Sequence, residues 1–368
     1  YGDAGNDTIT SSGTGDVVDA GEGDNTIVIT GTAAGGSYTS GSGFDAYIIQ
    51  TGTTGSYAIS SGAGNDTFSI QSGTTESITI NAGDGLNSIN ASSKIYRFDS
   101  GTGNDVVNLT SVAGIVITGA GDDVITATGK IGNDWTFYYD TGFGYVGIRA
   151  GDGNDIITLT GGSGVDIYGS EYYRSRIQGD NGNDTITLAG NASYGDVFGG
   201  NDNDIIDASG ANDARRIFGD AGNDTITGTA SDDNIWGGSG NDLIAAGNGN
   251  NNVYAEDGDD TITAGSGNDN LYGGNGIDVI TSGDGNDNLF GEADNDSLNG
   301  GSGYDTLQGG SGNDTLQAGA GNDVIYGGSS TAANTDPNEI DTVVLTGNAS
   351  DYTISRATDS IFGYVYYI

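Results

Sequence analysis

The clearest pattern in the chain is a nine-residue repeat of apolar and polar positions that runs without insertion or deletion from Gly219 to Tyr326. One apolar residue between two outward-facing neighbours is typical of a short β-strand with a single buried side chain. The repeat therefore predicts short strands separated by glycine-rich loops. The eighth residue of all twelve copies is aliphatic: Ile226, Ile235, Ile244, Val253, Ile262, Leu271, Ile280, Leu289, Leu298, Leu307, Leu316 and Ile325.

Each loop ends at the sixth position of the repeat, which holds Asp in every copy except the one with Asn251. Copies such as GGSGNDLIA place glycine where the backbone has to turn sharply. A solenoid in which two nonapeptides make one coil accommodates such a repeat, because each coil buries its apolar residues against its neighbours. We therefore predict an all-β fold, a right-handed parallel β-helix or β-roll.

Residues 1–218 carry the same loop at wider spacing. Segments between the loops, such as TIVIT and TFSIQ, alternate as half-buried strands do, and ordinary turns such as QSGTTE lie opposite the loops. This part therefore resembles a broader, degenerate version of the same helix. Its loops are GDAGND, SGSGFD, SGAGND, SGTGND, TGAGDD, AGDGND, GDNGND and GGNDND, which end at Asp7, Asp45, Asp66, Asp105, Asp123, Asp155, Asp184 and Asp204.

The chemistry of these loops indicates calcium, which prefers six to eight oxygen ligands in a flexible geometry. Glycines let backbone carbonyl groups turn inward, and the terminal Asp adds a charged oxygen. Two loops on the same edge of the solenoid together supply enough oxygens. The predicted ligands are Asp7, Asp45, Asp66, Asp105, Asp123, Asp155, Asp166, Asp184, Asp204, Asp224, Asp233, Asp242, Asp260, Asp269, Asp278, Asp287, Asp296, Asp305, Asp314 and Asp323.

The 18-residue spacing assigns these ligands to edges. Asp224 and Asp242 begin one edge of the regular array, and Asp233 and Asn251 begin the other. In residues 1–218 the calcium loops lie mainly on one edge. Asn25 and Asn87 replace Asp in AGEGDN and AGDGLN, so we expect weak or empty sites there.

The pattern divides the chain into three parts. Residues 1–218 form the broader helix, residues 219–326 the regular β-roll, and residues 327–368 an irregular loop followed by C-terminal capping strands. A cap is expected because the last strand of a solenoid otherwise exposes an unpaired edge.

Composition agrees with a metal-dependent fold. The formal net charge is -42, and no Lys or Arg lies between residues 217 and 355, so multiple calcium ions are the expected counter-charge. This charge excludes nucleic-acid binding. The absence of Cys and His excludes disulfides, histidine-based zinc sites and Ser-His-Asp triads. No apolar stretch is long enough to predict a transmembrane segment.

These loops resemble the RTX family of hemolysin-type calcium-binding repeats, whose form is G-G-x-G-x-D-x-U-x. Residues 219–326 match that form almost throughout, and most of the remaining chain matches it in degenerate form. The resemblance implies a parallel β-roll, export in unfolded form by a type I secretion system, and folding triggered by calcium outside the cell. No catalytic or pore-forming part accompanies the repeats, so we expect no enzyme activity and no catalytic residues.

A second pattern is a stripe of aromatic and asparagine residues at 18-residue spacing. Two interpretations remain open: a stack that stabilises neighbouring coils, or a contact surface for another subunit, the parent protein or glycan rings. Its members are Phe198, Phe218, Trp236, Tyr254, Tyr272, Phe290 and Tyr326, with Asn234, Asn252, Asn270 and Asn288 beside them.

These features favour an extracellular structural protein: a surface fibre, surface-layer subunit or adhesin-type solenoid made rigid by calcium between successive coils. The alternative is the C-terminal secretion and folding module of a type I-secreted enzyme or toxin. Tyr1 fits the ninth position of a preceding repeat, which indicates a longer parent chain. A catalytic signature upstream of Tyr1 would favour the alternative, and further repeats there would favour the structural protein.

Overall fold

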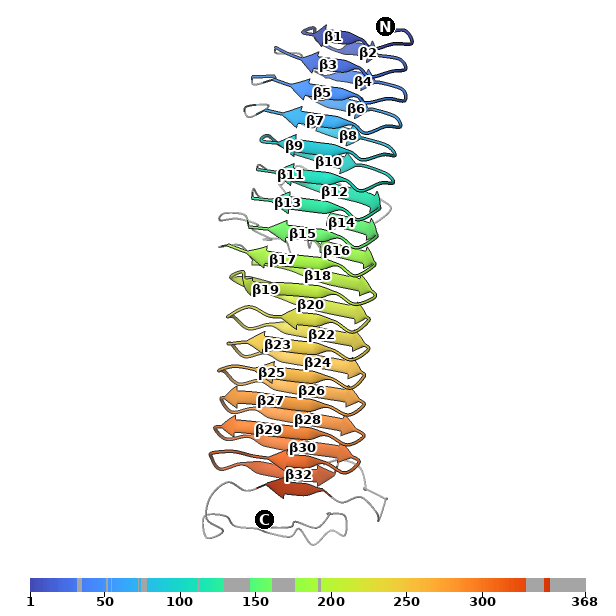
Figure 1. Ribbon diagram of the computed structural model, residues 1–368. Helices are drawn as coiled ribbons and strands as arrows, with labels where there is room; N and C mark the ends of the chain where they lie inside the picture. The colour runs from blue at the N-terminus through green and yellow to red at the C-terminus, as the bar shows by residue number, and fades with distance from the viewer. Residues whose placement is uncertain are drawn as a thin grey trace. The chain divides into compact units, whose positions relative to one another are not determined.

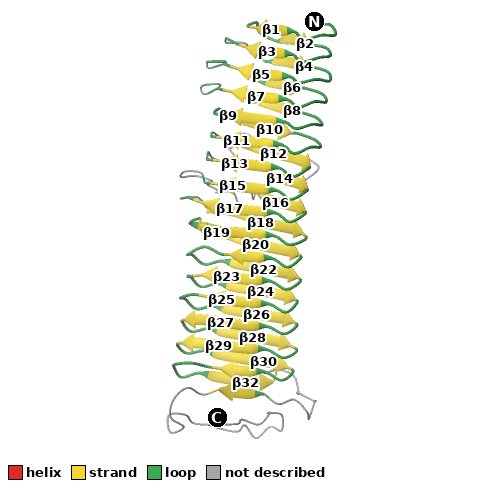
Figure 2. Cartoon of the chain, viewed as in Figure 1, coloured by secondary structure: helices red, strands yellow, loops and turns green. Residues whose placement is uncertain are grey.

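The computed structural model describes residues 1–31, 35–50, 52–53, 55–71, 73, 78–110, 113–128, 146–160, 176–190, 193–328 and 341–344. In these residues all regular secondary structure is β-strand (Figure 2), and no helix is long and apolar enough to cross a membrane. Backbone contacts divide the chain into two compact units, Tyr1–Phe198 (unit 1) and Gly199–Ile368 (unit 2). The boundary falls inside β18 (Ser193–Asn201), and the predicted division after residue 218 lies inside unit 2.

Unit 1 is built from two parallel sheets whose strands alternate along the chain (Figure 1). Each strand pairs with the next strand of its own sheet, so two strands make one coil. The odd-numbered sheet contains β1 (Thr8–Ser11), β3 (Thr26–Ile29), β5 (Ala46–Ile49), β7 (Thr67–Ile70), β9 (Ser88–Ala91), β11 (Val106–Leu109), β13 (Val124–Ala127), β15 (Ile156–Leu159) and β17 (Thr185–Ala189). The even-numbered sheet contains β2 (Asp16–Asp19), β4 (Gly36–Thr39), β6 (Tyr57–Ser60), β8 (Ile78–Asn81), β10 (Ile95–Asp99), β12 (Ala113–Ala120), β14 (Val146–Asp152) and β16 (Arg176–Asn181).

Unit 2 repeats this architecture, and its strand pairs within residues 219–326 have the 18-residue register expected from the sequence. Its odd-numbered strands are β19 (Ile205–Gly210), β21 (Thr225–Thr227), β23 (Leu243–Gly247), β25 (Thr261–Ala264), β27 (Val279–Asp284), β29 (Ser297–Ser302), β31 (Thr315–Gln317) and β33 (Thr342–Val344). Its even-numbered strands are β20 (Asp213–Ala221), β22 (Asn234–Ser239), β24 (Asn252–Asp257), β26 (Asn270–Asn275), β28 (Asn288–Ala293), β30 (Thr306–Ser311) and β32 (Val324–Gly328).

The core of unit 2 is a set of aliphatic rows, as the eighth repeat position predicts. Ile226 pairs with Ile244 in the odd-numbered sheet, and Ile235 pairs with Val253 in the even-numbered sheet. All four side chains have 0% exposure. The parallel β-solenoid predicted from the repeat is therefore confirmed, and burial of these rows supplies its main apolar stabilisation.

The core of unit 1 also contains large aromatic side chains. Tyr38, Tyr47, Phe68 and Phe98 are among its largest fully buried residues, and the Tyr47 and Phe68 rings stack with centroids 5.3 Å apart. Such rings need a wider interior than one lined by Ile, Leu and Val. That the helix of residues 1–218 is broader than that of residues 219–326 stays a prediction.

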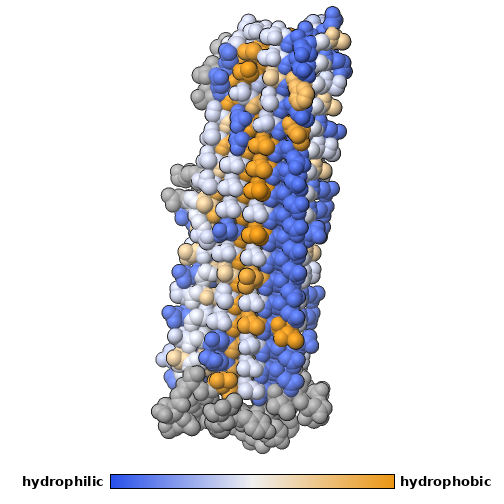
Figure 3. All heavy atoms as spheres, in the orientation of Figure 1, coloured by the Kyte–Doolittle hydropathy of each residue, from blue (hydrophilic) through white to orange (hydrophobic). Residues whose placement is uncertain are grey.

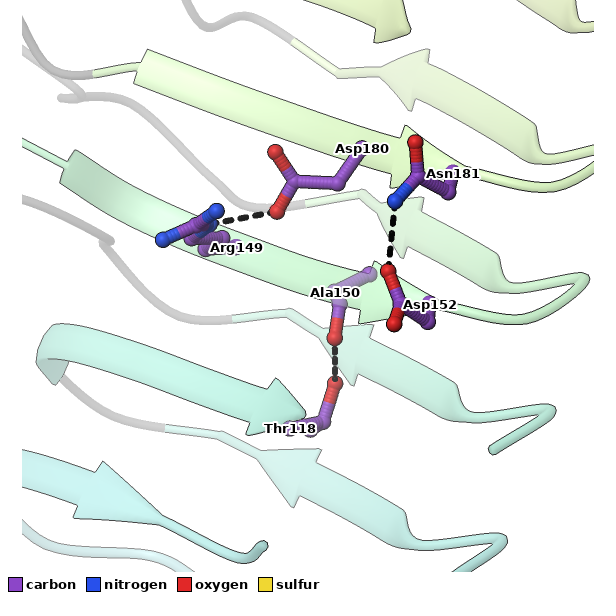
Figure 4. Close-up of polar contacts among 6 residues, drawn as sticks. All are labelled: Thr118, Arg149, Ala150, Asp152, Asp180 and Asn181. Atoms are coloured by element: carbon purple, nitrogen blue, oxygen red, sulfur yellow. Dashed lines mark hydrogen bonds and ion pairs between the residues drawn. The ribbon is translucent and has the colours of Figure 1, made fainter. Parts of the chain in front are cut away.

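Polar contacts also join successive coils of unit 1 (Figure 4). The Arg149 guanidinium on β14 donates to and pairs with the Asp180 carboxylate on β16, and the Asn181 amide donates to Asp152 over 2.6 Å. The Thr118 hydroxyl on β12 donates to the carbonyl of Ala150 over 3.0 Å. These side-chain contacts join coils whose strands are also paired by backbone hydrogen bonds.

The loops follow two edges, which we define separately in each unit. Edge A contains the loops that lead into odd-numbered strands, and edge B contains those that lead into even-numbered strands. Within each unit, Figure 3 shows hydrophilic residues gathered along one side, beside a column of apolar and near-neutral residues. Of the predicted C-terminal cap, only residues 327–328 and 341–344 belong to the described structure, where β33 pairs with β31.

Candidate metal centre

The sixth-position residues of edge A in unit 2 form a ladder of hydrogen bonds. The backbone N–H of each residue donates to Oδ1 of the corresponding residue one coil later. The bonded pairs are Asp204–Asp224 (2.8 Å), Asp224–Asp242 (2.8 Å), Asp242–Asp260 (2.7 Å), Asp260–Asp278 (2.9 Å), Asp278–Asp296 (2.9 Å) and Asp296–Asp314 (2.9 Å). From Asp224 to Asp314 this register is the one that the 18-residue spacing predicts for the edge, whereas Asp204 and Asp224 are 20 residues apart.

Edge B of unit 2 carries a second ladder of the same kind. Its bonded pairs are Asp233–Asn251 (3.0 Å), Asn251–Asp269 (2.7 Å), Asp269–Asp287 (2.9 Å), Asp287–Asp305 (3.0 Å) and Asp305–Asp323 (3.0 Å). On both edges of unit 2 the sixth-position residues of successive coils are therefore hydrogen-bonded to each other.

In unit 1 the corresponding ladder runs along edge A. The sequence places the predicted calcium loops of this part mainly on one edge. Its bonded pairs are Asp7–Asn25 (3.1 Å), Asn25–Asp45 (2.9 Å), Asp45–Asp66 (2.9 Å), Asp66–Asn87 (3.0 Å), Asn87–Asp105 (2.6 Å), Asp105–Asp123 (2.7 Å), Asp123–Asp155 (2.7 Å) and Asp155–Asp184 (2.8 Å). The predicted ligand Asp166 lies outside the described residues.

The second carboxylate oxygen, Oδ2, is buried in most of these loops and accepts no hydrogen bond from the described residues. A Cβ added to Gly237 would lie only 2.3 Å from Oδ2 of Asp242, so this oxygen points into its own loop. A buried charged oxygen without a partner is costly unless a cation neutralises it. The aspartates in this state include Asp45, Asp66, Asp105, Asp123, Asp155, Asp224, Asp242, Asp260, Asp269, Asp278, Asp287, Asp296 and Asp305.

The electrostatics of the ladder also favour a bound cation. Burial, followed by the like charges of neighbouring carboxylates, raises the pKa of Asp242 to about 7 and that of Asp296 to about 8. Both shifts mean that the charged form of these side chains is destabilised in the absence of metal. Because residues 217–355 contain no Lys or Arg, no basic side chain from this segment can compensate.

No group of three or more acidic, His or Cys side chains converges on one point within the described residues. A cation bound in these loops would need oxygens other than carboxylates to complete its shell. Glycines at the second and fourth loop positions, such as Gly238 (φ 117°) and Gly240 (φ 118°), have a backbone conformation that side chains disfavour. A donor set of carboxylate and carbonyl oxygens fits calcium rather than a transition metal.

A family model described as the RTX calcium-binding nonapeptide repeat, with four copies of the repeat, matches several segments of the chain. The matched residues are 1–28, 172–192, 216–244, 236–271, 245–280, 272–307 and 305–330. The chain carries RTX calcium-binding repeats. These repeats bind calcium, and the positive charge of the bound ion compensates the negative charge of the buried carboxylates.

One solved structure similar to this chain is that of a hyperactive, Ca²⁺-dependent, β-helical antifreeze protein from an Antarctic bacterium. The two share 18% sequence identity with a TM-score of 0.41, over 92% of this chain and 86% of the other. No curated protein matches this chain in sequence.

One predicted ligand has a different environment. Both carboxylate oxygens of Asp233 accept hydrogen bonds from Thr229, whose backbone N–H lies 2.7 Å from Oδ2 and whose hydroxyl lies 3.0 Å from each oxygen. The loop GTASDD lacks glycine at its second and fourth positions, which is the signal in the sequence that sets it apart. This loop is closed by its own side chains, and we propose that Asp233 is not a calcium ligand.

Sequence reasoning missed one member of the edge A ladder. Asp341 is buried, and its Oδ1 accepts the backbone N–H of Asp314 over 3.2 Å. A Cβ on Gly327 would lie 2.1 Å from Oδ2 of Asp341, the relation that Gly237 has to Asp242. Asp341 therefore occupies the position of a further loop aspartate. The nine-residue spacing does not reach it, because fourteen residues, Gly327–Ile340, precede it in place of the usual five.

From Phe218 to Phe290 the aromatic stripe is a continuous stack in unit 2, and Gln308 separates Phe290 from Tyr326. Its centroid distances are 4.7 Å for Phe218–Trp236, 5.6 Å for Trp236–Tyr254, 4.8 Å for Tyr254–Tyr272 and 4.7 Å for Tyr272–Phe290. Beside it, the amides of Asn252, Asn270 and Asn288 donate to the preceding Asn of the row over 3.1, 2.9 and 2.9 Å. Because neighbouring rings cover each other's faces, the internal rings expose mainly their edges, which favours the stabilising interpretation.

Several exposed aliphatic side chains lie on the outer face of the odd-numbered strands, although others, such as Val17 on β2, lie elsewhere. Val106 and Ile156 in unit 1 have 38% and 47% exposure, and Leu243 and Val279 in unit 2 have 50% and 45%. Each is the outward residue at the start of its strand. In unit 1 this face is uncharged, whereas in unit 2 it includes Asp207 on β19; sequence reasoning did not single it out.

Proposed function

We propose that this RTX protein is a calcium-dependent structural protein that works outside the cell, as a fibre, surface-layer or adhesin-type solenoid. The observation that carries the proposal is the row of buried Asp Oδ2 atoms without hydrogen-bond partners. These atoms make the stacked coils dependent on bound cations, because like charges at the strand spacing of about 4.8 Å repel each other when uncompensated.

This dependence supports an extracellular location. Loop sites that share their metal between successive coils and rely on carbonyl oxygens suit the millimolar calcium outside cells rather than the low calcium of a cytosol. A chain with these loops would stay unfolded until export and become rigid where calcium is available. The alternative, a folding module attached to an upstream enzyme, uses the same calcium chemistry.

A calcium titration tests the first part of the proposal. The full chain is followed by far-UV circular dichroism from chelator to millimolar calcium, with magnesium at equal concentration as the control. A cooperative rise of the β signal with calcium alone is expected. A β signal that is unchanged by the chelator would contradict the proposed metal dependence.

Localisation of the native protein tests the second part. Immunogold electron microscopy of intact cells, with fractionation of the medium, is expected to show the protein in ordered surface material. The parent chain isolated from the same source is then assayed and sequenced. A catalytic domain upstream of Tyr1 that retains activity without surface assembly would support the alternative function.

A second candidate function, ordering water or binding ice, is favoured by the outer face of the odd-numbered sheet in unit 1. Its outward positions are uncharged in every strand from β1 to β17, and Thr occupies many of them, including Thr126 on β13. Outward hydroxyl and methyl groups, with amides at Asn90 and Asn108, repeat there at about 4.8 Å per coil. Measurement of thermal hysteresis in calcium tests this candidate. Thr126→Tyr should reduce the hysteresis, whereas Thr79→Tyr on the other sheet should leave it unchanged. Absence of hysteresis in the unsubstituted protein would exclude this second function.

A further inference from the structure

Three loops have Asn at the position where the others have Asp. They end at Asn25 and Asn87 on edge A of unit 1 and at Asn251 on edge B of unit 2. Each Asn Oδ1 accepts the backbone N–H of the preceding ladder residue, over 3.1, 3.0 and 3.0 Å respectively. This bond fixes the orientation of each amide, so the Nδ2 group takes the place that Oδ2 has in an Asp loop.

The amide nitrogen of each Asn donates hydrogen bonds to two carbonyl groups of its own loop. In unit 1, Asn25 Nδ2 lies 3.2 Å from Gly21 O and 2.9 Å from Gly23 O. In unit 2, Asn251 Nδ2 lies 3.3 Å from Gly247 O and 3.2 Å from Gly249 O.

The Asn87 loop repeats the arrangement, with Nδ2 to carbonyl distances of 2.9 Å to Gly83 and 3.4 Å to Gly85. The same two loop positions, the second and the fourth, provide the acceptors in all three cases. The arrangement therefore belongs to the loop type and not to one location in the chain.

An Asp loop cannot be closed in this way, because a carboxylate oxygen accepts but does not donate. We propose that Asn25, Asn87 and Asn251 close their loops without calcium, with the amide N–H groups in place of the cation. The proposal rests on calcium binding by the Asp loops. A neutral amide also removes one negative charge from the ladder at each of these coils.

The start of edge B in unit 2 gives independent support. The Asp233 loop directly precedes the Asn251 loop in the ladder. In the first loop Thr229 donates hydrogen bonds to the Asp233 carboxylate, and in the second the Asn251 amide donates to backbone carbonyl groups. The side chains of two successive loops are therefore hydrogen-bonded within the protein. The next residue, Asp269, is the first on this edge whose buried Oδ2 accepts no hydrogen bond from the described residues. Calcium binding on edge B should therefore begin at the Asp269 loop.

The experiment counts calcium ions bound per chain, by elemental analysis and native mass spectrometry of the full chain equilibrated with calcium. Asn251→Asp is expected to bind one calcium ion more than the unsubstituted chain, and the matched Asp269→Asn variant is expected to bind one fewer. Asn25→Asp provides a second gain variant in unit 1 if Asn251→Asp does not fold.

A second readout is the calcium concentration at the midpoint of folding, measured by circular dichroism. Asn251→Asp should move this midpoint to higher calcium, because a self-closed loop has become one that needs a cation. An unchanged ion count in Asn251→Asp and Asn25→Asp, together with a loss of one ion in Asp269→Asn, would overturn the proposal. Loss of no ion in Asp269→Asn would instead count against the proposed calcium loops themselves.

Discussion

The backbone N–H of Asp242 donates a hydrogen bond of 2.7 Å to Oδ1 of Asp260, one coil further along the chain, while Oδ2 of Asp260 accepts no hydrogen bond from the described residues. One carboxylate therefore has two separate tasks. Its first oxygen connects adjacent coils, and its second is left for a cation. Folding and calcium binding are coupled because both depend on the same side chain.

Because the two oxygens of Asp260 have different roles, Asp260→Ala is expected to be more destabilising than Asp260→Asn in saturating calcium. Both variants lose the charged ligand, but Asn keeps an acceptor for the Asp242 N–H, whereas Ala leaves that buried donor without this bond. The difference should be about 1–3 kcal/mol. Urea denaturation followed by circular dichroism measures it, and equal midpoints for the two variants would contradict the ladder's structural role.

The calcium-free protein should lose β structure as pH rises. Burial raises the pKa of Asp242 to about 7 and of Asp296 to about 8, well above the usual value for Asp. The folded state without metal then binds more protons than the unfolded state, so its stability falls as pH increases from about 4 to about 8. Circular dichroism in chelator should show more β structure at pH 5 than at pH 8, and the opposite order would contradict this assignment.

Protons and calcium should also compete for the loops. Because the raised pKa values reflect uncompensated charge, calcium must displace protons from these carboxylates when the pH is low. The calcium concentration at the folding midpoint is expected to increase as pH decreases from 8 to 6. Titrations at fixed ionic strength check this expectation, since added salt alone screens the repulsion between carboxylates.

The aromatic stack predicts a stability effect at Tyr254, whose ring lies between Trp236 and Tyr272 at 5.6 and 4.8 Å. Tyr254→Ala removes two stacking contacts and should cost about 1–3 kcal/mol. Thr263→Ala, on the opposite sheet at the same repeat position, is the matched control and should change stability little. If Tyr254→Ala kept full stability but lost binding to a partner or glycan, the contact-surface interpretation would replace the structural one.

Asp341 is predicted to hold the last described coil of unit 2. Asp341→Ala removes the acceptor of the Asp314 N–H and should loosen β33, while the rows nearer the centre of unit 2 remain protected. Hydrogen exchange of Thr342–Val344 measures this local effect. Exchange that is unchanged in this segment, or that increases equally throughout unit 2, would contradict a local role.

Much of the fold was predictable because the repeat is regular. Ile226 and Ile244 could be assigned to one buried row, since a period of 18 residues per coil allows only one register without exposing the apolar positions. The Asp ladder followed from the same spacing. Asp341 could not be found this way, because fourteen residues in place of five separate it from the last regular repeat, which breaks the period.

The sequence by itself determined the coil, the buried rows, the alignment of sixth-position residues and the calcium chemistry of the loops. All of these depend on periodicity and on residue type. Only the tertiary structure decided what each loop does with its aligned residue. Whether Thr229 satisfies Asp233, whether the Asn251 amide reaches the carbonyls of Gly247 and Gly249, and whether Oδ2 of Asp269 lacks a donor depend on distances within each loop. Those distances come from the three-dimensional path of the backbone, which brings into contact groups that the repeat pattern only places on the same edge.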